Sequence, residues 1–187
     1  VGDDHQQQGV DEWDEQQRRD DEVIREAHVA IYIEEKQVLS APCLDSEREL
    51  FVYGALYTQK GILPQDVSRI EWKGLTVFVH LKEGAAPAEP TPGLVQVPLE
   101  PRFSSESVSA RVEEFQQLSG LFKATGAVHV AALCTADEII CWNEDISRRT
   151  ALDKVIGKWL LDTLSGAHKG DGSRHLHTAA QDLFLLT

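Results

Sequence analysis

Residues 144–164, which read EDISRRTALDKVIGKWLLDTL, are the stretch that decides the fold. Apolar side chains recur along it at the spacing of one face of an α-helix. This stripe, the most regular in the chain, comprises Leu152, Val155, Ile156, Trp159, Leu160 and Leu164. The acidic pair Glu144-Asp145 favours a helix amino terminus before the stripe, and Gly166 is a stop signal after it. The stretch therefore predicts a long amphipathic helix.

The segments on either side of this helix predict strands and a second helix. Ala127–Leu133 alternates as a strand and is expected to pair with a strand over Glu138–Trp142. After a polar loop, residues 183–186 (LFLL) are expected to form another buried strand. Upstream, apolar residues at helical spacing predict a helix that ends at Gly120: Val108, Val112, Phe115 and Leu118. The second half of the chain is therefore mixed α/β.

The first half combines strands with one helix. Ala27–Ile33 alternates as a strand, and the charged residues 34–36 are expected to turn the chain after it. Ser46 and Glu49 have the spacing of a capping box, which predicts a helix that runs on to Gly61. Two apolar stretches, Ile70–Trp72 and Leu75–Leu81, are expected to form a hairpin around Lys73-Gly74.

Composition divides the chain and limits its partners. The 187 residues suffice for one domain with a tail, and the net charge is −13. Residues 1–22 hold nine acids and two arginines, which is typical of a disordered acidic tail. Residues 23–103 form the first portion, with a proline-rich loop at 83–93, and residues 104–187 form the second, which is expected to be incomplete at its carboxyl end. The negative net charge disfavours nucleic acid and anionic membranes as partners. No apolar run is long enough to span a membrane, and the first residues do not resemble a secretory signal. We therefore expect a soluble, cytoplasmic protein.

Two stretches carry a resemblance to a known family. Residues 125–133 (TGAVHVAAL), followed after the hairpin by residues 144–157 (EDISRRTALDKVIG), closely resemble the formate dehydrogenase accessory sulfurtransferase family, FdhD/NarQ. Arg25-Glu26, Ala41-Pro42 and residues 49–63 look like the first half of that family. The resemblance implies an α/β (α+β) fold in which the second portion is a cytidine deaminase-like layered sheet with helices, beside a smaller amino-terminal α/β portion. Deamination itself is excluded, because the chain has neither His-x-Glu nor Pro-Cys-x-x-Cys.

The activity that the resemblance implies is sulfur transfer. Family members take persulfide sulfur from a cysteine desulfurase and pass it to the molybdenum cofactor, bis-molybdopterin guanine dinucleotide, for formate dehydrogenase; GDP is the expected analogue of this ligand. Such a carrier needs an exposed thiolate of lowered pKa. The Cys-x-x-Cys pair of the family falls between the hairpin and the next helix, yet residues 84–107 contain no cysteine. Either sulfur transfer has been lost or a loop is missing from the sequence.

Three cysteines remain as substitutes. Cys43 lies just before the predicted helix, where the helix dipole would lower its pKa, and is the backup catalytic thiol. Cys134 and Cys141 are expected to be small, half-buried residues at the ends of a hairpin. We expect no protein-bound metal, because no Cys-x-x-Cys or His-x-x-x-His spacing occurs and the histidines of the last polar loop have no accompanying thiolate.

A polar cluster at the start of the long helix is the candidate cofactor site. Basic side chains and backbone amides at a helix start favour phosphate. The predicted cofactor-binding residues are Thr125, Gly126, His129, Asp145, Arg148, Asp153 and Lys154. Alternatively, the two aspartates cap the helix and pair with the neighbouring basic residues, and His129 is a hydrogen-bonded core residue. Where the family reads Gly-Arg-His-Asn, residues 147–150 read SRRT, so Arg148 alone is kept.

Two classes of function remain. One is the sulfur carrier, with a cysteine desulfurase and formate dehydrogenase as partners. The other is a non-catalytic protein that binds a guanine nucleotide or pterin dinucleotide and acts as a chaperone of formate dehydrogenase. Since the fold is expected to lack one edge of its sheet, a homodimer could supply the missing cover.

Overall fold

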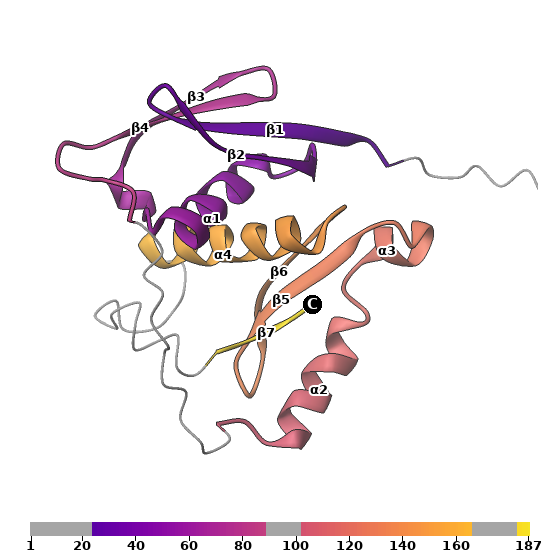
Figure 1. The fold of residues 1–187 in the computed structure, drawn as a ribbon. Helices are drawn as coiled ribbons and strands as arrows, with labels where there is room; N and C mark the ends of the chain where they lie inside the picture. Colours follow the sequence, from indigo (N-terminus) through magenta and orange to yellow (C-terminus); the bar gives the residue numbers. More distant parts are fainter. Residues whose placement is uncertain (1–23, 89–101, 166–182) are drawn as a thin grey trace, which may run out of the picture.

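The computed structural model describes residues 24–88, 102–165 and 183–187 (Figure 1). In chain order the elements are β1 (Glu26–Ile33), β2 (Lys36–Leu44), α1 (Arg48–Lys60), a short 3-10 turn (Pro64–Asp66), β3 (Val67–Lys73), β4 (Thr76–Leu81), α2 (Ser105–Phe115), α3 (Gly120–Thr125), β5 (His129–Cys134), β6 (Ile139–Asp145), α4 (Arg148–Leu164) and β7 (Phe184–Leu186). The mixed α/β class is confirmed, whereas the cytidine deaminase-like relationship of the second portion stays a prediction.

The first half is a four-stranded sheet in the order β2-β1-β4-β3, covered on one face by α1. Alternate residues of β1 point into the core below the sheet, and Val29 and Ile31 are almost completely buried there. Phe51 and Leu56 of α1 fill the same core. The hairpin between β3 and β4 forms as predicted, and Gly74 takes its turn with a φ of 63°.

Strand β2 was not indicated by the sequence pattern. It pairs antiparallel with β1 at the edge of the sheet, and its apolar residues do not alternate regularly. Pro42, which cannot donate a backbone hydrogen bond, lies within it, and only an edge strand accommodates a proline in this way.

The second half is an antiparallel sheet in the order β6-β5-β7, packed against α4. The strands predicted at 127–133, 138–142 and 183–186 all form, as does the long helix. The last strand, β7, is not buried as expected, because Leu185 is 46% exposed. The helix before β5 is different, because α2 ends at Phe115 and Gly120 begins α3 instead of stopping a helix. Ser119 caps α3 by accepting a hydrogen bond from the backbone N–H of Phe122, so the chain makes two short helices here.

The start of α1 also differs from the capping-box prediction. The residue before the helix is Glu47, in a left-handed conformation with a φ of 52° and no side-chain cap. The carbonyl of Ser46 instead accepts a hydrogen bond from the Lys154 ammonium at 2.7 Å. A tertiary contact therefore sets this helix start in place of a local cap, while the predicted end at Gly61 is confirmed.

The two halves meet where α1 crosses α4. A Cβ atom added at Gly54 would lie 1.7 Å from the Asp153 backbone oxygen, and one added at Gly157 would lie 1.9 Å from the Leu50 oxygen. The two helix backbones are thus in direct contact, which glycine alone permits.

Several predictions fall on other parts of the chain. The acidic tail at 1–22, residues 89–93 of the proline-rich loop, Gly166 and the late histidine loop lie outside the described residues. No described helix has both the length and the apolar character that crossing a bilayer demands.

Candidate functional site

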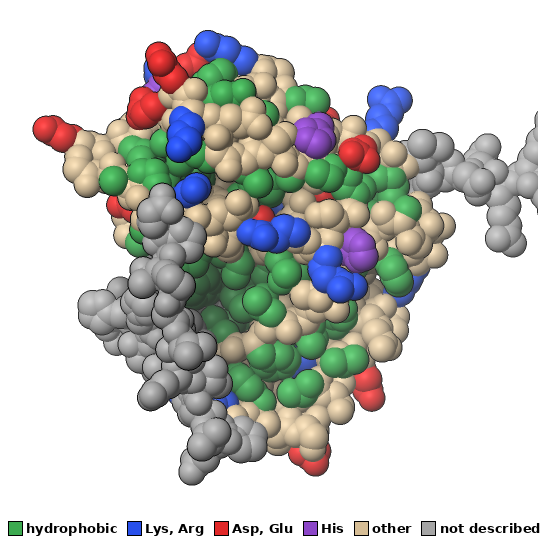
Figure 2. Space-filling view, in the orientation of Figure 1, with side chains coloured by type: hydrophobic (Ala, Val, Ile, Leu, Met, Phe, Trp, Pro, Cys, Tyr) green, Lys and Arg blue, Asp and Glu red, His purple; other side chains and the backbone are tan. Residues whose placement is uncertain are grey.

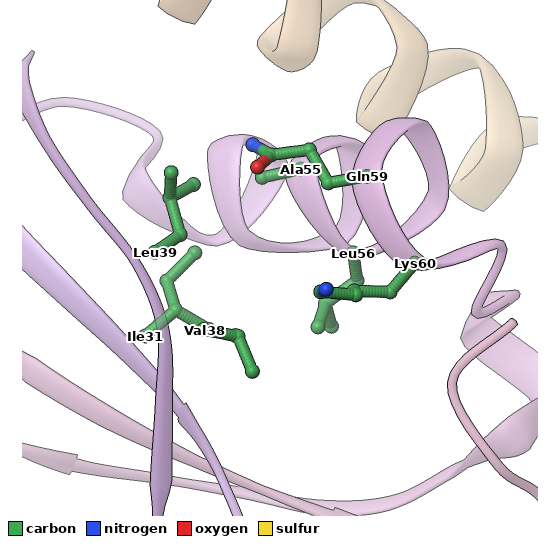
Figure 3. Close-up of a pocket in the computed structure, with 7 residues that line it drawn as sticks. All are labelled: Ile31, Val38, Leu39, Ala55, Leu56, Gln59 and Lys60. Atoms are coloured by element: carbon green, nitrogen blue, oxygen red, sulfur yellow. The ribbon is translucent and has the colours of Figure 1, made fainter. Parts of the chain in front are cut away.

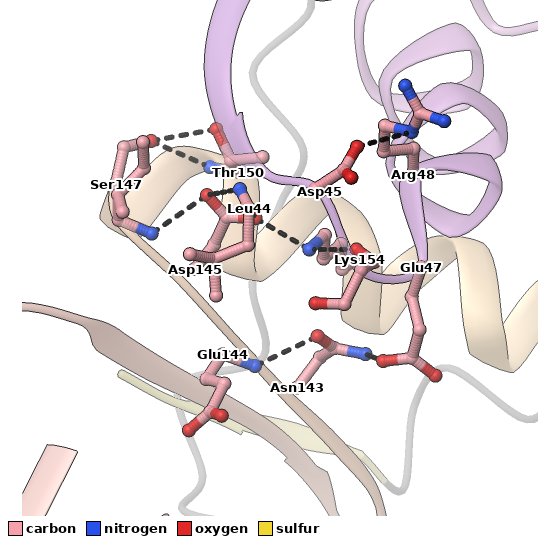
Figure 4. Close-up of polar contacts among 12 residues, drawn as sticks. Leu44, Asp45, Glu47, Arg48, Asn143, Glu144, Asp145, Ser147, Thr150 and Lys154 are labelled. Carbon is pink, nitrogen blue, oxygen red and sulfur yellow. Dashed lines mark hydrogen bonds and ion pairs between the residues drawn. The ribbon is translucent and has the colours of Figure 1, made fainter. Parts of the chain in front are cut away.

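The polar cluster predicted at the start of α4 is built around a buried ion pair (Figure 4). The Lys154 ammonium lies 2.7 Å from an Asp145 carboxylate oxygen, and neither side chain has any exposed surface. Asp145 also accepts hydrogen bonds from the backbone N–H groups of Leu44 and Ile146. Burial raises the pKa of Asp145, while Lys154 and the backbone donors act in the opposite direction. Asp145 and Lys154 therefore use their polar atoms inside the protein, where a ligand cannot contact them.

A second set of contacts joins the first turn of α4 to the end of β2. Ser147 caps the helix by accepting from the Thr150 backbone N–H at 3.1 Å. The Thr150 hydroxyl donates to the Pro42 carbonyl at 3.0 Å. Together with the Lys154–Ser46 hydrogen bond, these contacts clasp residues 42–46 of the first half against the second half. We refer to this set of contacts as the clasp.

Asp153 lies in the second turn of α4 and faces α1. Its Oδ1 accepts from the Thr58 hydroxyl at 2.8 Å, and the side chain is 2% exposed. Its Oδ2 has no hydrogen-bond partner; the nearest basic group is Arg149 Nε at 3.5 Å, on a side chain that is 62% exposed. Burial raises the pKa of Asp153, and Thr58 and Arg149 lower it in part. Asp153 is thus one contact between the halves and the inner partner of an exposed arginine.

The other predicted cofactor-binding residues lie nearer the surface. Arg148 and His129 are exposed, which excludes the core role considered for His129. His129 begins β5 opposite Asp145, and Arg148 follows Asp145 by three residues, so both lie at the same end of the second sheet. Thr125 and Gly126 form the turn just before β5, where Gly126 ends α3 with a φ of 64°.

Arg149 is exposed and was not among the predicted cofactor-binding residues. The sequence shows that it follows Arg148 and lies four residues before Asp153. It was left out because the family has a histidine at this position. Figure 2 shows a few separate basic side chains and one histidine near the level that α4 occupies in Figure 1, with uncharged atoms between them.

All three cysteines of the chain are buried. Cys43 is 0% exposed within β2, and burial raises its pKa to about 11. The expectation of a lowered pKa at Cys43 is therefore wrong, because its side chain faces the core and not the start of α1. Burial also raises the pKa of Cys134, and that of Cys141 to about 12. In this conformation the chain presents no reactive thiolate.

The hollow drawn in Figure 3 is too small for a cofactor. It measures about 10 Å³ and lies between β1, β2 and α1, with Ile31, Leu39 and Leu56 among its lining residues. This is space for about one water molecule. Within the described ranges, no three histidine, cysteine or acidic side chains come together as a metal site would require.

The fold is similar to that of a protein from Desulfotalea psychrophila described as a putative formate dehydrogenase accessory protein. Its crystal structure superimposes with a TM-score of 0.56 and 22% sequence identity, over 73% of this chain and 60% of that chain. The sequence is more specific: the model of the FdhD/NarQ family matches residues 24–170, and the chain belongs to this family.

Curated relatives agree with this assignment. The sulfur carrier protein FdhD of Bacillus subtilis is 42% identical over 64 residues, which are 34% of this chain and 24% of the relative. The protein of the same name from Wolinella succinogenes is 26% identical over 166 residues, covering 74% of this chain and 57% of the relative. The chain thus spans from about a quarter to just over half of the length of these relatives.

Proposed function

We propose that this chain is a sulfur carrier that serves formate dehydrogenase by passing persulfide sulfur from a cysteine desulfurase to the molybdenum cofactor, bis-molybdopterin guanine dinucleotide. The observation that carries the proposal is the family match over residues 24–170. It is supported by relatives that are named sulfur carrier proteins and by a structural neighbour described as a formate dehydrogenase accessory protein.

The loading step defines what the chain must provide. A carrier thiolate attacks the outer sulfur of the desulfurase persulfide, a new S–S bond forms on the carrier, and the desulfurase thiolate leaves, so no external oxidant or reductant is needed. Cys43 is the proposed carrying thiol, because it lies in the segment at residues 42–46, which the clasp holds at Pro42 and Ser46. Since Cys43 is buried and has a pKa of about 11, loading requires residues 42–46 to move out of the clasp.

The cofactor is proposed to contact the exposed part of the predicted set. Arg148 and His129 present basic groups at one end of the second sheet, beside the turn at Thr125-Gly126. The anionic diphosphate bridges of the cofactor match such groups in charge. The buried contacts of Asp145, Asp153 and Lys154 would hold the start of α4 in place without contacting the cofactor.

A second function is favoured by the buried thiols. A protein whose three cysteines are all buried suits a binding role, in which it holds a guanine nucleotide or pterin dinucleotide and acts as a chaperone of formate dehydrogenase without carrying sulfur.

One loading experiment separates the two functions. The chain is incubated with a cysteine desulfurase and sulfur-labelled cysteine, and protein-bound persulfide is measured beside the Cys43→Ser variant. The carrier predicts label on the wild type that is lost in the variant. A wild type without label, which nevertheless binds GDP in isothermal titration, establishes the binder instead.

A further inference from the structure

Residues 42–47, which lead from β2 into α1, are held at three main-chain positions by side chains of the second half. The carbonyls of Pro42 and Ser46 accept hydrogen bonds from side chains of α4 at 3.0 and 2.7 Å. Between them, the Leu44 backbone N–H donates to a carboxylate of β6. We refer to residues 42–47 as the strap. Its attachment thus depends on polar contacts between the halves.

The attachment of the strap to its own sheet is weak. β2 is an edge strand, and Pro42 has no N–H to donate to the pairing with β1. Within the strap, only Cys43 and Leu44 are buried, with exposed fractions of 0% and 8%. Detaching these six residues would therefore expose little apolar surface, and Phe51 and the other core residues of α1 would stay in place.

Glu47 ends the strap in a strained conformation. Its φ of 52° and ψ of 34° are left-handed, which costs free energy in any residue with a Cβ atom. The Glu47 carboxylate accepts a hydrogen bond at 2.7 Å from the side-chain amide of Asn143, a residue of β6 that is 5% exposed (Figure 4). The next residue, Arg48, is anchored with its guanidinium 4.9 Å from the centre of the Trp72 ring. The bond from Asn143 therefore offsets strain at the junction of strap and helix.

We propose that the strap opens as a local unit that begins at Pro42 and hinges at Glu47, and that Asn143 locks it shut. In the open state the Glu47 backbone leaves the left-handed region, and Cys43 becomes accessible while both sheets stay folded. This inference rests on the proposed function for the role of Cys43, because it supplies the movement that sulfur loading requires. The opening itself needs neither a cofactor nor a sulfur donor.

Thiol modification of the unaltered full chain tests whether the opening is local. The chain is treated with iodoacetamide at several urea concentrations below its unfolding midpoint, and the rate at each cysteine is followed by mass spectrometry. The slow modification of Cys43 should hardly depend on urea, because local opening exposes little surface. Cys141, buried between β6 and α4, should react through global unfolding, with a rate that rises steeply. An equally steep rise at Cys43 would overturn the strap.

Two substitutions at Glu47 separate the lock from the hinge. Glu47→Ala and Glu47→Gly both lose the hydrogen bond from Asn143, but only alanine keeps the cost of the left-handed backbone. The rate at Cys43 should rise about tenfold in Glu47→Ala, because a hydrogen bond to a charged group is lost. It should be about fivefold lower in Glu47→Gly than in Glu47→Ala. A glycine variant that reacts as fast as the alanine variant would overturn the hinge.

Glu34 provides the matched control. It is the other non-glycine residue of the described chain with a positive φ, 54°, and it lies in the turn between β1 and β2. Glu34→Ala should change the rate at Cys43 less than twofold, and a rise equal to that of Glu47→Ala would overturn the lock.

Sulfur loading is measured separately from the opening. A Cys43 that opens locally but takes no persulfide refutes the carrier and leaves the strap standing. Persulfide on a Cys43 whose modification rises with urea as steeply as that of Cys141 refutes the strap alone.

Discussion

At the scale of single residues, the main result is that the candidate motif is divided between interior and surface. Asp145, Asp153 and Lys154 point inward, while Arg148 and His129 remain exposed. The alternative, in which Asp145 and Asp153 cap the helix and pair with neighbouring basic residues, is therefore right about the pairing. Asp145 pairs with Lys154, and Asp153 pairs with Arg149. The spacing of these residues could not show this, because a helix start looks the same in sequence whether its charges face solvent or another element.

The buried pair gives a prediction for stability. Lys154→Met should lower the free energy of unfolding by about 3–5 kcal/mol, because it leaves Asp145 charged and buried without its partner. Chemical denaturation measures this loss. Lys158→Met, a half-exposed control on the same helix, should cost less than about 1 kcal/mol. Equal losses in the two variants would show that the pair has no special weight.

The thiols give a prediction for reactivity. Alkylation of the native protein at pH 8 should be slow at all three cysteines, because burial hides them and raises the pKa of Cys43 to about 11 and of Cys141 to about 12. Modification followed by mass spectrometry checks this, with the urea-unfolded chain as the fully reactive reference. Rapid native modification of Cys43 would mean that the clasp is open in solution.

At the scale of elements, the sequence predicted helices and strands correctly where one side of the element faces a single core. The helical spacing of apolar residues in α4 and their alternation in β1 and β5 were visible for this reason. Strand β2 was missed because it is an edge strand with a proline and irregular burial, and the start of α1 was misplaced because a lysine about a hundred residues away holds Ser46. Contacts of that range leave no local pattern.

The crossing of α1 and α4 gives a prediction at this scale. Gly157→Ala should destabilise the protein by about 3 kcal/mol, because the new Cβ would overlap the backbone of Leu50 and force the helices apart. Gly120→Ala is the control, since a Cβ there meets nothing within 4 Å and should be neutral or stabilise by about 0.5 kcal/mol. Thermal unfolding of both variants tests the contrast, and similar midpoints would contradict the close approach.

At the scale of the whole molecule, buried carboxylates link stability to pH. Burial raises the pKa of Asp153 above its ordinary value of 3.8, so the folded protein binds this proton more tightly than the unfolded chain. The contribution of Asp153 to stability is therefore complete below about pH 3.8 and is lost as pH rises through its folded pKa.

This linkage can be measured as a slope. Between pH 4 and pH 7, the free energy of unfolding of the wild type should fall relative to that of Asp153→Asn, which has no proton to lose at this position. Urea titrations at several pH values give both curves. Asp145 titrates in both proteins and cancels in the difference, so parallel curves would show that Asp153 keeps its ordinary pKa.

The backbone contact between α1 and α4 also constrains how the protein could be divided or engineered. Gly54 and Gly157 form two notches, one on each helix, and each notch is filled by the main chain of the other helix. A fragment that stops before residue 102 would present an unfilled groove along α1 to water. Split-protein reporters and fusion points are therefore better placed in surface turns, such as the one at Gly74, than between the halves.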